Sequence, residues 1–220
     1  MLRSVLTYPL FLLVTLLFTN LQVIKAQDNW TLSTEHDGIN VYTRPTANSK
    51  LKAIKISCTI QAGPSQLLAA ILDIKTCNEW VYHSKQNVLI KQISPIDLIY
   101  YSEVEVPWPS ENRDFVVHIQ TEQDPKTKII TVNSPCVPGY REERDGIIRI
   151  SHSVGKWTIT PVTKNQVRAE YVLEVDPLGT IPAWLINLFA TKGPLETFKK
   201  LKVHVQNEEY KRAHYSQIVD

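Results

Sequence analysis

The chain has 220 residues, of which 43% are hydrophobic and 21% charged, with 7 glycines and 13 prolines. This composition indicates one globular domain, and it excludes a disordered or repetitive chain. The formal net charge is +2.

The first 26 residues have the pattern of a secretory signal peptide. Arg3 gives a short positive start, residues 10–17 are apolar except for Thr15, and the segment ends at Ala26. This pattern predicts export, to a periplasm or out of the cell, with cleavage after Ala26. The alternative is an uncleaved leader that anchors the protein in a membrane, although residues 8–24 are barely long enough to span one.

Removal of this leader changes the charge of the chain. Arg3 and Lys25 leave without any acidic residue, so 22 of the 24 Lys and Arg residues remain against 22 Asp and Glu. The mature domain is then formally neutral, and we infer no nucleic-acid partner from its charge.

The three cysteines are Cys58, Cys77 and Cys136, and they include no C-x-x-C pair. We therefore expect no metal site, no redox site and no cofactor. Cys58 falls in the apolar register of a predicted strand, where a thiol serves as a small core residue. A disulfide between two of the three cysteines is possible, and the sequence does not assign it.

The mature chain begins with predicted strands and two helices. Asp37-Gly38 indicates a hairpin turn, and residues 50–61 alternate between apolar and polar side chains, as in a half-buried strand. Pro64 opens a helix with one apolar face. Residues 76–79 match a capping box that starts a second, short helix.

Beyond this helix the apolar period returns to two, which predicts a series of strands. They are expected at residues 88–93, 98–106, 113–120, 128–132, 147–150, 156–161 and 167–175, with a hairpin turn at Asp145-Gly146. Short connections between strands favour an antiparallel, meandering sheet.

Residues 176–205 predict one long C-terminal helix. A turn ending at Gly179 precedes it, Thr180 is placed as its N-cap, and Pro182 falls in its first turn. Apolar residues recur at helical spacing on both sides of Gly193-Pro194, where the helix should bend because Pro194 has no N–H to donate. So much apolar surface needs a large, curved partner.

The last residues, 207–220, are polar with little periodic signal, and we expect this tail to fray. No linker or repeat divides the rest. The predicted organisation is a leader at 1–26, one domain at 27–206 and the tail.

No catalytic motif occurs in the chain. Nucleophile elbows, zinc-protease helices, phosphate loops and dinucleotide fingerprints are absent, and the six histidines lack ligand spacing. We therefore assign no catalytic and no metal-binding residue.

The most specific stretch is VPWPSENRDFVV, residues 106–117. Trp108 lies between two prolines in a rigid aromatic loop, and a strand resumes at Arg113. Arg113 shares an apolar strand face with Phe115 and Val117.

A buried charge pair is one hypothesis for this stretch. On the preceding strand, Glu103 shares a face with Tyr101, and if both apolar faces line one interior, Arg113 and Glu103 could meet there. The alternative is that Arg113 pairs with Asp114 or with solvent at a strand end.

Several stretches together point to a known family. They are W-x-L-x-x-E-x-D-G-I-x-V-Y-T-R at residues 30–44, the helix at 64–72 with Trp80 beyond it, VPWPSENRDFVV, GKWTITP at 155–161 and DPLGTIPAWLIN at 176–187. In this order the chain resembles the START domain, the steroidogenic acute regulatory protein-related lipid-transfer domain. The resemblance covers essentially the whole mature chain.

The resemblance implies an α+β helix-grip fold, in which a strongly curved antiparallel sheet wraps around a long C-terminal helix and encloses an apolar tunnel. Arg113 matches the family's tunnel arginine and Glu103 its acidic partner. The candidates for the tunnel wall or lid are Trp108, Phe115, Val117, Tyr101, Trp184, Leu185, Leu188 and Phe189, and the hinge candidates are Gly193 and Pro194.

We therefore expect a monomeric, non-enzymatic carrier that binds one lipid or other hydrophobic molecule in the domain at 27–206, with at most transient membrane contact. The alternative is a helix-grip enzyme, a hydrolase or cyclase-like catalyst with Glu103 as its base. A third reading is a structural or partner-binding domain with a filled interior. The family's sterol, phospholipid and ceramide preferences do not transfer to an exported chain.

Overall fold

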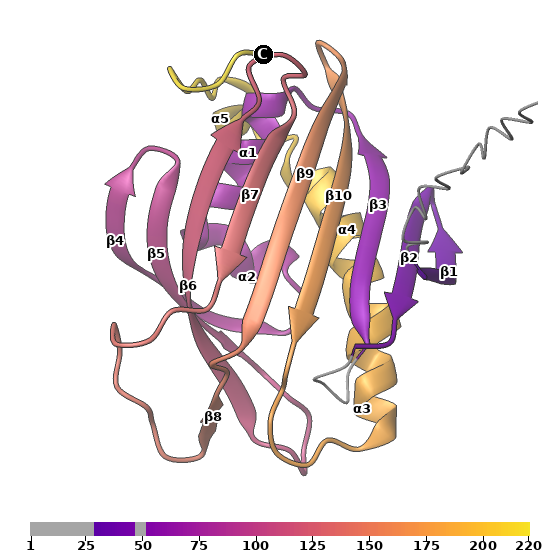
Figure 1. Ribbon diagram of the computed structural model, residues 1–220, viewed down its shortest axis with the longest axis vertical. Helices are drawn as coiled ribbons and strands as arrows, with labels where there is room; N and C mark the ends of the chain where they lie inside the picture. The colour runs from indigo at the N-terminus through magenta and orange to yellow at the C-terminus, as the bar shows by residue number, and fades with distance from the viewer. Residues whose placement is uncertain (1–28, 47–51) are drawn as a thin grey trace, which may run out of the picture.

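The computed structural model describes residues 29–46 and 52–220, so the predicted leader lies outside the described residues. In these two segments ten strands form one sheet (Figure 1). The strands are β1 (Thr31–His36), β2 (Ile39–Arg44), β3 (Ala53–Ile60), β4 (Ser84–Ser94), β5 (Asp97–Val104), β6 (Asn112–Gln123), β7 (Ile130–Pro135), β8 (Ile147–Arg149), β9 (Ser153–Thr163) and β10 (Gln166–Val175).

The helical segments lie before β4 and after β10. They are α1 (Pro64–Leu72), the 3-10 turn η1 (Ile74–Thr76), α2 (Cys77–Trp80), α3 (Ala183–Asn187), the π-helical turn η2 (Leu188–Lys192), α4 (Gly193–His204) and α5 (Glu208–Lys211). Along the described chain, no helix is long and apolar enough to cross a membrane.

The strands follow the order β1-β2-β3-β10-β9-β7-β6-β5-β4, and every neighbouring pair in this order is antiparallel. The sheet is not closed, because β1 and β4 form its two edges. In Figure 1, helices α1, α2 and α4 lie behind the sheet. This confirms the predicted α+β fold with an antiparallel sheet against a C-terminal helix.

Local chemistry explains the first elements. Asp37 and Gly38 both adopt positive φ, 52° and 69°, which is the backbone that a two-residue hairpin turn requires between β1 and β2. Helix α1 starts at Pro64, and the side chain of Gln66 accepts a hydrogen bond from the N–H of Gly63 at 3.3 Å.

The buried core lies mainly between the helices and the face of the sheet that they cover, which we call the inner face. The largest fully buried side chains include Ile39, Ile60, Leu67, Leu68, Leu98, Ile130, Ile159, Phe198 and Leu201. A second, small cluster of Ile99, Tyr101 and Val116 lies apart from this core. It marks the outer face of β5 and β6.

The C-terminal helix starts later than predicted and is interrupted. Pro182 has extended backbone angles and occupies the N-cap position of α3, so Thr180 is not the cap. The π-helical turn η2 comes directly before Gly193-Pro194, where the sequence predicts a bend. Because Pro194 cannot donate to the carbonyl of residue 190, a wider turn is a low-cost way to continue the helix.

The expectation of a fraying tail is wrong. Tyr210 and Ile218 are buried, and the Tyr210 hydroxyl donates to Asp73 Oδ2 at 2.9 Å. Asp220 Oδ1 accepts the N–H of Ser65, at the start of α1, at 2.7 Å. Two buried apolar residues in fourteen are too few to give a periodic signal, yet they hold the tail on α1.

Two local predictions are also wrong. Thr76 does not form a capping box, because its Oγ1 donates to the carbonyl of Asp73 instead of accepting a helix N–H. Asp145-Gly146 does not turn a hairpin, because β8 pairs in parallel with β6, from Asn112 opposite Ile147 to Asp114 opposite Arg149.

Candidate functional site

Two adjoining cavities lie between the inner face of the sheet and the helices. Chamber 1 has a volume of about 270 Å³ and is lined by seven strands together with α1, α2 and α4. Chamber 2 has a volume of about 190 Å³ and lies where β5, β6 and β10 meet the segment that leads into α3. Both chambers are lined by Ile54, Val104, Leu173 and Phe189, so they adjoin one another across these residues.

Chamber 1 is apolar and uncharged. Among the described residues, no Asp, Glu, Lys, Arg or His lines it. Its polar groups are hydroxyls, thiols and amides, including those of Cys77, Asn87, Tyr100, Ser102, Ser134, Tyr171 and Thr197. Burial raises the pKa of Tyr171 to about 12 and the pKa of Tyr100 well above its ordinary value, so both phenols stay neutral.

Among the residues that the structure describes, the one buried cation of the two chambers is Arg113, which lines chamber 2 and is 6% exposed. Its Nε donates to the carbonyl of Pro177 at 3.3 Å, its Nη2 to that of Leu178 at 3.2 Å and its Nη1 to that of Glu111. Burial lowers the pKa of Arg113, against the opposing effect of the Glu111 charge. Arg113 therefore ties the turn before α3 to strand β6.

The structure does not bring Arg113 and Glu103 together. In the antiparallel register of β5 and β6, Arg113 lies opposite Val104, whereas Glu103 lies opposite Asp114. Val104 and Arg113 line chamber 2 on the inner face. Glu103 and Asp114 therefore point to the outer face, because successive side chains of a strand alternate between faces.

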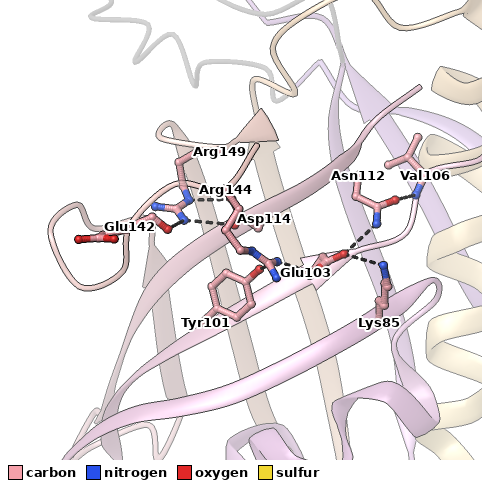
Figure 2. Close-up of polar contacts among 9 residues, drawn as sticks. All are labelled: Lys85, Tyr101, Glu103, Val106, Asn112, Asp114, Glu142, Arg144 and Arg149. Carbon is pink, nitrogen blue, oxygen red and sulfur yellow. Dashed lines mark hydrogen bonds and ion pairs between the residues drawn. The ribbon is translucent and has the colours of Figure 1, made fainter. Parts of the chain in front are cut away.

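Glu103 is instead the centre of a polar cluster on the outer face (Figure 2). Its carboxylate accepts a hydrogen bond from Arg144 at 2.5 Å and one from Asn112 at 2.8 Å, and Lys85 Nζ lies 3.0 Å away. The Tyr101 hydroxyl also accepts a hydrogen bond from Arg144. Burial by itself raises the pKa of a carboxyl, but these donors outweigh it and lower the pKa of Glu103 to about 2.

Asp114 forms the second pair of the cluster. Arg149 donates to both of its carboxylate oxygens, at 2.7 and 3.1 Å, in the bidentate geometry that favours arginine. Arg144 and Arg149 both belong to the segment between β7 and the end of β8, which covers this part of the outer face (Figure 2). The cluster therefore closes the outer face with paired charges.

The other predicted site residues divide between the cavities and the surface. Chamber 1 is lined by Phe115, Val117, Gly193 and Pro194, chamber 2 by Leu185, and both chambers by Phe189. Leu188 is half-buried and lines neither chamber. Tyr101 lies on the outer face, Trp108 is 89% exposed, and Trp184 is 51% exposed.

Several lining residues escape the sequence reasoning. Tyr100, Ser102 and Val104 face chamber 1 from β5, and Tyr171 and Leu173 face it from β10. Strand β5 is buried on both faces, so its burial does not alternate and its inner face cannot be identified from one strand alone. The signal that identifies the inner face of β5 is its pairing with β6, where Phe115 and Val117 share an apolar face.

The cysteines take no part in a cross-link. Cys58, Cys77 and Cys136 are free thiols, and burial raises the pKa of Cys77, which lines chamber 1, to about 12. In the two described segments, no group of three His, Cys, Asp or Glu side chains is placed to hold a metal ion.

Comparison with known proteins gives consistent matches. A family model described as START domain matches residues 17–211. An uncharacterised protein of Pseudomonas aeruginosa is 33% identical over 175 residues, which are 80% of this chain and 86% of that protein. The phosphatidylcholine transfer protein of Bos taurus is 28% identical over 183 residues, covering 81% of this chain and 84% of that protein.

A solved structure matches as well. The crystal structure of a STAR-related lipid transfer protein from Xanthomonas axonopodis gives a TM-score of 0.74 at 29% sequence identity. The match covers 82% of the present chain and 100% of the Xanthomonas chain. The arrangement of sheet and C-terminal helix is thus shared over nearly the whole described fold.

The outer cluster makes a prediction about stability. We expect Glu103→Gln to lower the free energy of unfolding at pH 7 by about 1–3 kcal/mol, because three donors lose a charged acceptor. Lys85 and Arg144 are partly exposed and regain hydration, which limits the loss. The folded pKa of Glu103, about 2, lies below its ordinary value of 4.5. Its contribution is therefore complete above pH 4.5 and is lost as the pH falls from 4.5 towards 2. Denaturant unfolding at a series of pH values measures both effects.

The matched control is Glu105→Gln, because Glu105 is exposed and lies two residues further along. We expect it to change the free energy of unfolding by less than about 0.5 kcal/mol. An equal effect of the two substitutions, or a gap between wild type and Glu103→Gln that stays constant down to pH 2, would contradict the assignment.

Proposed function

Because the chain belongs to the START domain family, we propose that it is a carrier that binds one hydrophobic, lipid-like molecule in chambers 1 and 2. The observation that carries this proposal is the lining of chamber 1, which is apolar, bears neutral hydroxyls and contains no charged side chain among the described residues. Such a lining suits a hydrocarbon group with few polar atoms.

The energy of burial is sufficient for tight binding. A sixteen-carbon chain that leaves water gains about 0.8 kcal/mol for each methylene, a gross contribution on the order of 10 kcal/mol. Part of it offsets the ordering of the ligand and of the protein. The net binding free energy is compatible with a carrier that holds its ligand and also releases it.

We also propose that the protein is not an enzyme. A general base must reach the substrate through a hydrogen bond, and Glu103, the base of the enzymatic alternative, lies on the outer face with its oxygens bonded to Lys85, Arg144 and Asn112. Within the described chain no carboxylate or imidazole lines either chamber. The proposed carrier acts as a monomer and, from its predicted leader, outside the cytoplasm.

The place where a ligand enters is proposed to be η2. Phe189 on this turn lines both chambers, and its ring packs edge-on against Tyr82 and His83, with centroids 6.2 and 6.0 Å away. Gly193 packs so closely on Tyr82 that a Cβ there would lie 3.2 Å from its ring. A π-helical turn is an irregularity that is often found at functional sites. The turn would give the C-terminal helical segment a point at which to bend and open the cavity.

A transient membrane contact would place this entrance against a bilayer. Trp108 lies two residues after Val106, and Trp184 lies directly before Leu185; Val106 and Leu185 both line chamber 2. The β5–β6 loop and α3 lie at the same end of the sheet (Figure 1). Tryptophan prefers the membrane interface, so these two exposed rings are the proposed contact.

Ligand occupancy tests the function directly. We expect wild-type protein to release one hydrophobic molecule on extraction and to take up lipid again, as observed by native mass spectrometry. Val104→Trp fills the boundary between the chambers and should weaken uptake at least tenfold, whereas Val154→Trp, at a position 56% exposed, should leave it unchanged. Wild-type protein that is always empty and takes up no fatty acid, sterol or phospholipid would refute the carrier.

Hydrogen exchange tests the hinge. We expect amides of residues 188–198 to exchange faster than the rest of α4, and to slow when lipid is bound, because the ligand supports the π-helical turn from inside. The amides of β9 and β10 serve as an internal reference. Uniform exchange along the whole of α4, unaffected by ligand, would mean that Gly193-Pro194 only fits the helix to the sheet.

Vesicle flotation tests the membrane contact. We expect Trp108→Ala to reduce the fraction of protein that floats with phospholipid vesicles several-fold, because an exposed aromatic ring is lost from the interface. Tyr140→Ala removes another exposed aromatic ring, in the segment over the outer face, and should have no effect. Equal losses for both variants, or none for Trp108→Ala, would exclude this loop as the contact.

A further inference from the structure

Resting on the function proposed above, we propose that the ligand is an anionic single-chain amphipath, a monoacyl lipid whose headgroup is a carboxylate or a phosphate. Its headgroup would bind Arg113 in chamber 2, and its hydrocarbon chain would pass Phe189 into chamber 1.

The charge of chamber 2 gives the first reason. Its described lining is apolar apart from two cationic side chains, the buried Arg113 and the exposed Lys52. No carboxylate belongs to the lining in the part of the chain that is described. An apolar chamber with one cation inside and a second where it meets solvent favours an anion over a neutral or cationic headgroup.

The bonding of Arg113 gives the second reason. A guanidinium has five N–H donors, and three of those of Arg113 are used by the carbonyls of Glu111, Pro177 and Leu178. Carbonyls are dipoles and do not neutralise a full charge. Among the described residues, no carboxylate oxygen lies within 4.0 Å of Arg113.

The two arginines of the outer cluster, unlike Arg113, are each paired with a carboxylate. Arg149 is bonded to both oxygens of Asp114, and Arg144 to Glu103. A buried cation without an anion is costly, since it loses its hydration. The exposed Glu111 raises the pKa of Arg113 through its charge, but it forms no ion pair with it and burial prevails. The fork of donors in Arg113 is suited to carboxylate or phosphate oxygens, so an anionic headgroup would supply the close ion-pair partner that Arg113 lacks among the described residues.

The size and continuity of the chambers give the third reason. Volumes of about 270 and 190 Å³ together reach only the lower half of the roughly 300–1,000 Å³ typical of small-molecule pockets. This suits one chain better than two. Because the described residues that line chamber 1 carry no charge, the hydrocarbon chain would lie in chamber 1 and the headgroup in chamber 2.

The experiment compares ligands of equal chain length on the purified, delipidated protein. Isothermal titration at pH 7.5 would measure tetradecanoate, tetradecyl phosphate, tetradecanol and a phosphatidylcholine with two tetradecanoyl chains. We expect at least one of the two anions to bind at least tenfold more tightly than tetradecanol, and the two-chain lipid to bind more weakly than that anion. The ranking of carboxylate against phosphate identifies the headgroup.

Variants then assign the preference to Arg113. Arg113→Gln retains N–H donors but removes the charge, and should reduce the affinity for the anion at least tenfold while changing that for tetradecanol less than twofold. Arg113→Lys restores the charge and should recover part of the preference. Lys156→Gln removes an exposed cation from β9 and should change nothing. If Arg113→Gln does not fold, the ranking of the four ligands by the wild-type protein still tests the proposed ligand class.

The outcomes separate the two proposals. Equal affinity for tetradecanol and both anions, or a preference for the two-chain lipid, would overturn the ligand class and leave the carrier intact. An anion preference that survives in Arg113→Gln would overturn the role of Arg113. Failure to bind any of the four ligands would count against the carrier itself.

Discussion

The pairing of β5 with β6 decides which charges face the interior of this protein. One register places Val104 and Arg113 on the inner face and Glu103 and Asp114 on the outer face. A shift of β5 by one residue would turn Glu103 into the cavity and Val104 to the outer face, while Asp114 on β6 would stay outside. The absence of a carboxylate from the described lining of chamber 2 therefore depends on this strand alignment.

The two faces of the sheet carry different parts of the stability. The outer face is closed by ion pairs in which the carboxylates of Glu103 and Asp114 are buried, so removing their cationic partners would leave a buried negative charge. The inner face encloses space. The volume of about 270 Å³ in chamber 1 leaves apolar lining atoms without packing partners, which costs stability. A bound hydrocarbon that fills this space would recover much of that cost.

The sequence predicts the elements well because each has a local cause. Alternating side chains mark β3, Asp37-Gly38 marks the first hairpin, and Pro194 marks the irregular turn in the last helix. The faces of β5 are not predictable in this way. Both are buried, one by the cavity and helices and the other by the segment that carries Arg144 and Arg149, so alternation carries no information. The expected Arg113–Glu103 pair fails for this reason, whereas the cavity position of Phe115 and Val117 follows from β6 alone.

Arg113 also connects the cavity to the segment that we propose opens for the ligand. The segment from Pro177 to Gly193 is bounded at one end by the hydrogen bonds of Arg113 and at the other by the π-helical turn. A hydrogen bond from a charged donor is worth about 1.5–3 kcal/mol, so breaking the two bonds to Pro177 and Leu178 would cost a few kcal/mol. That matches the free energy at which a minor, open state is still populated. An anion that competes with these carbonyls for the same guanidinium would lower the cost, so that the group recognising the headgroup would also release the lid.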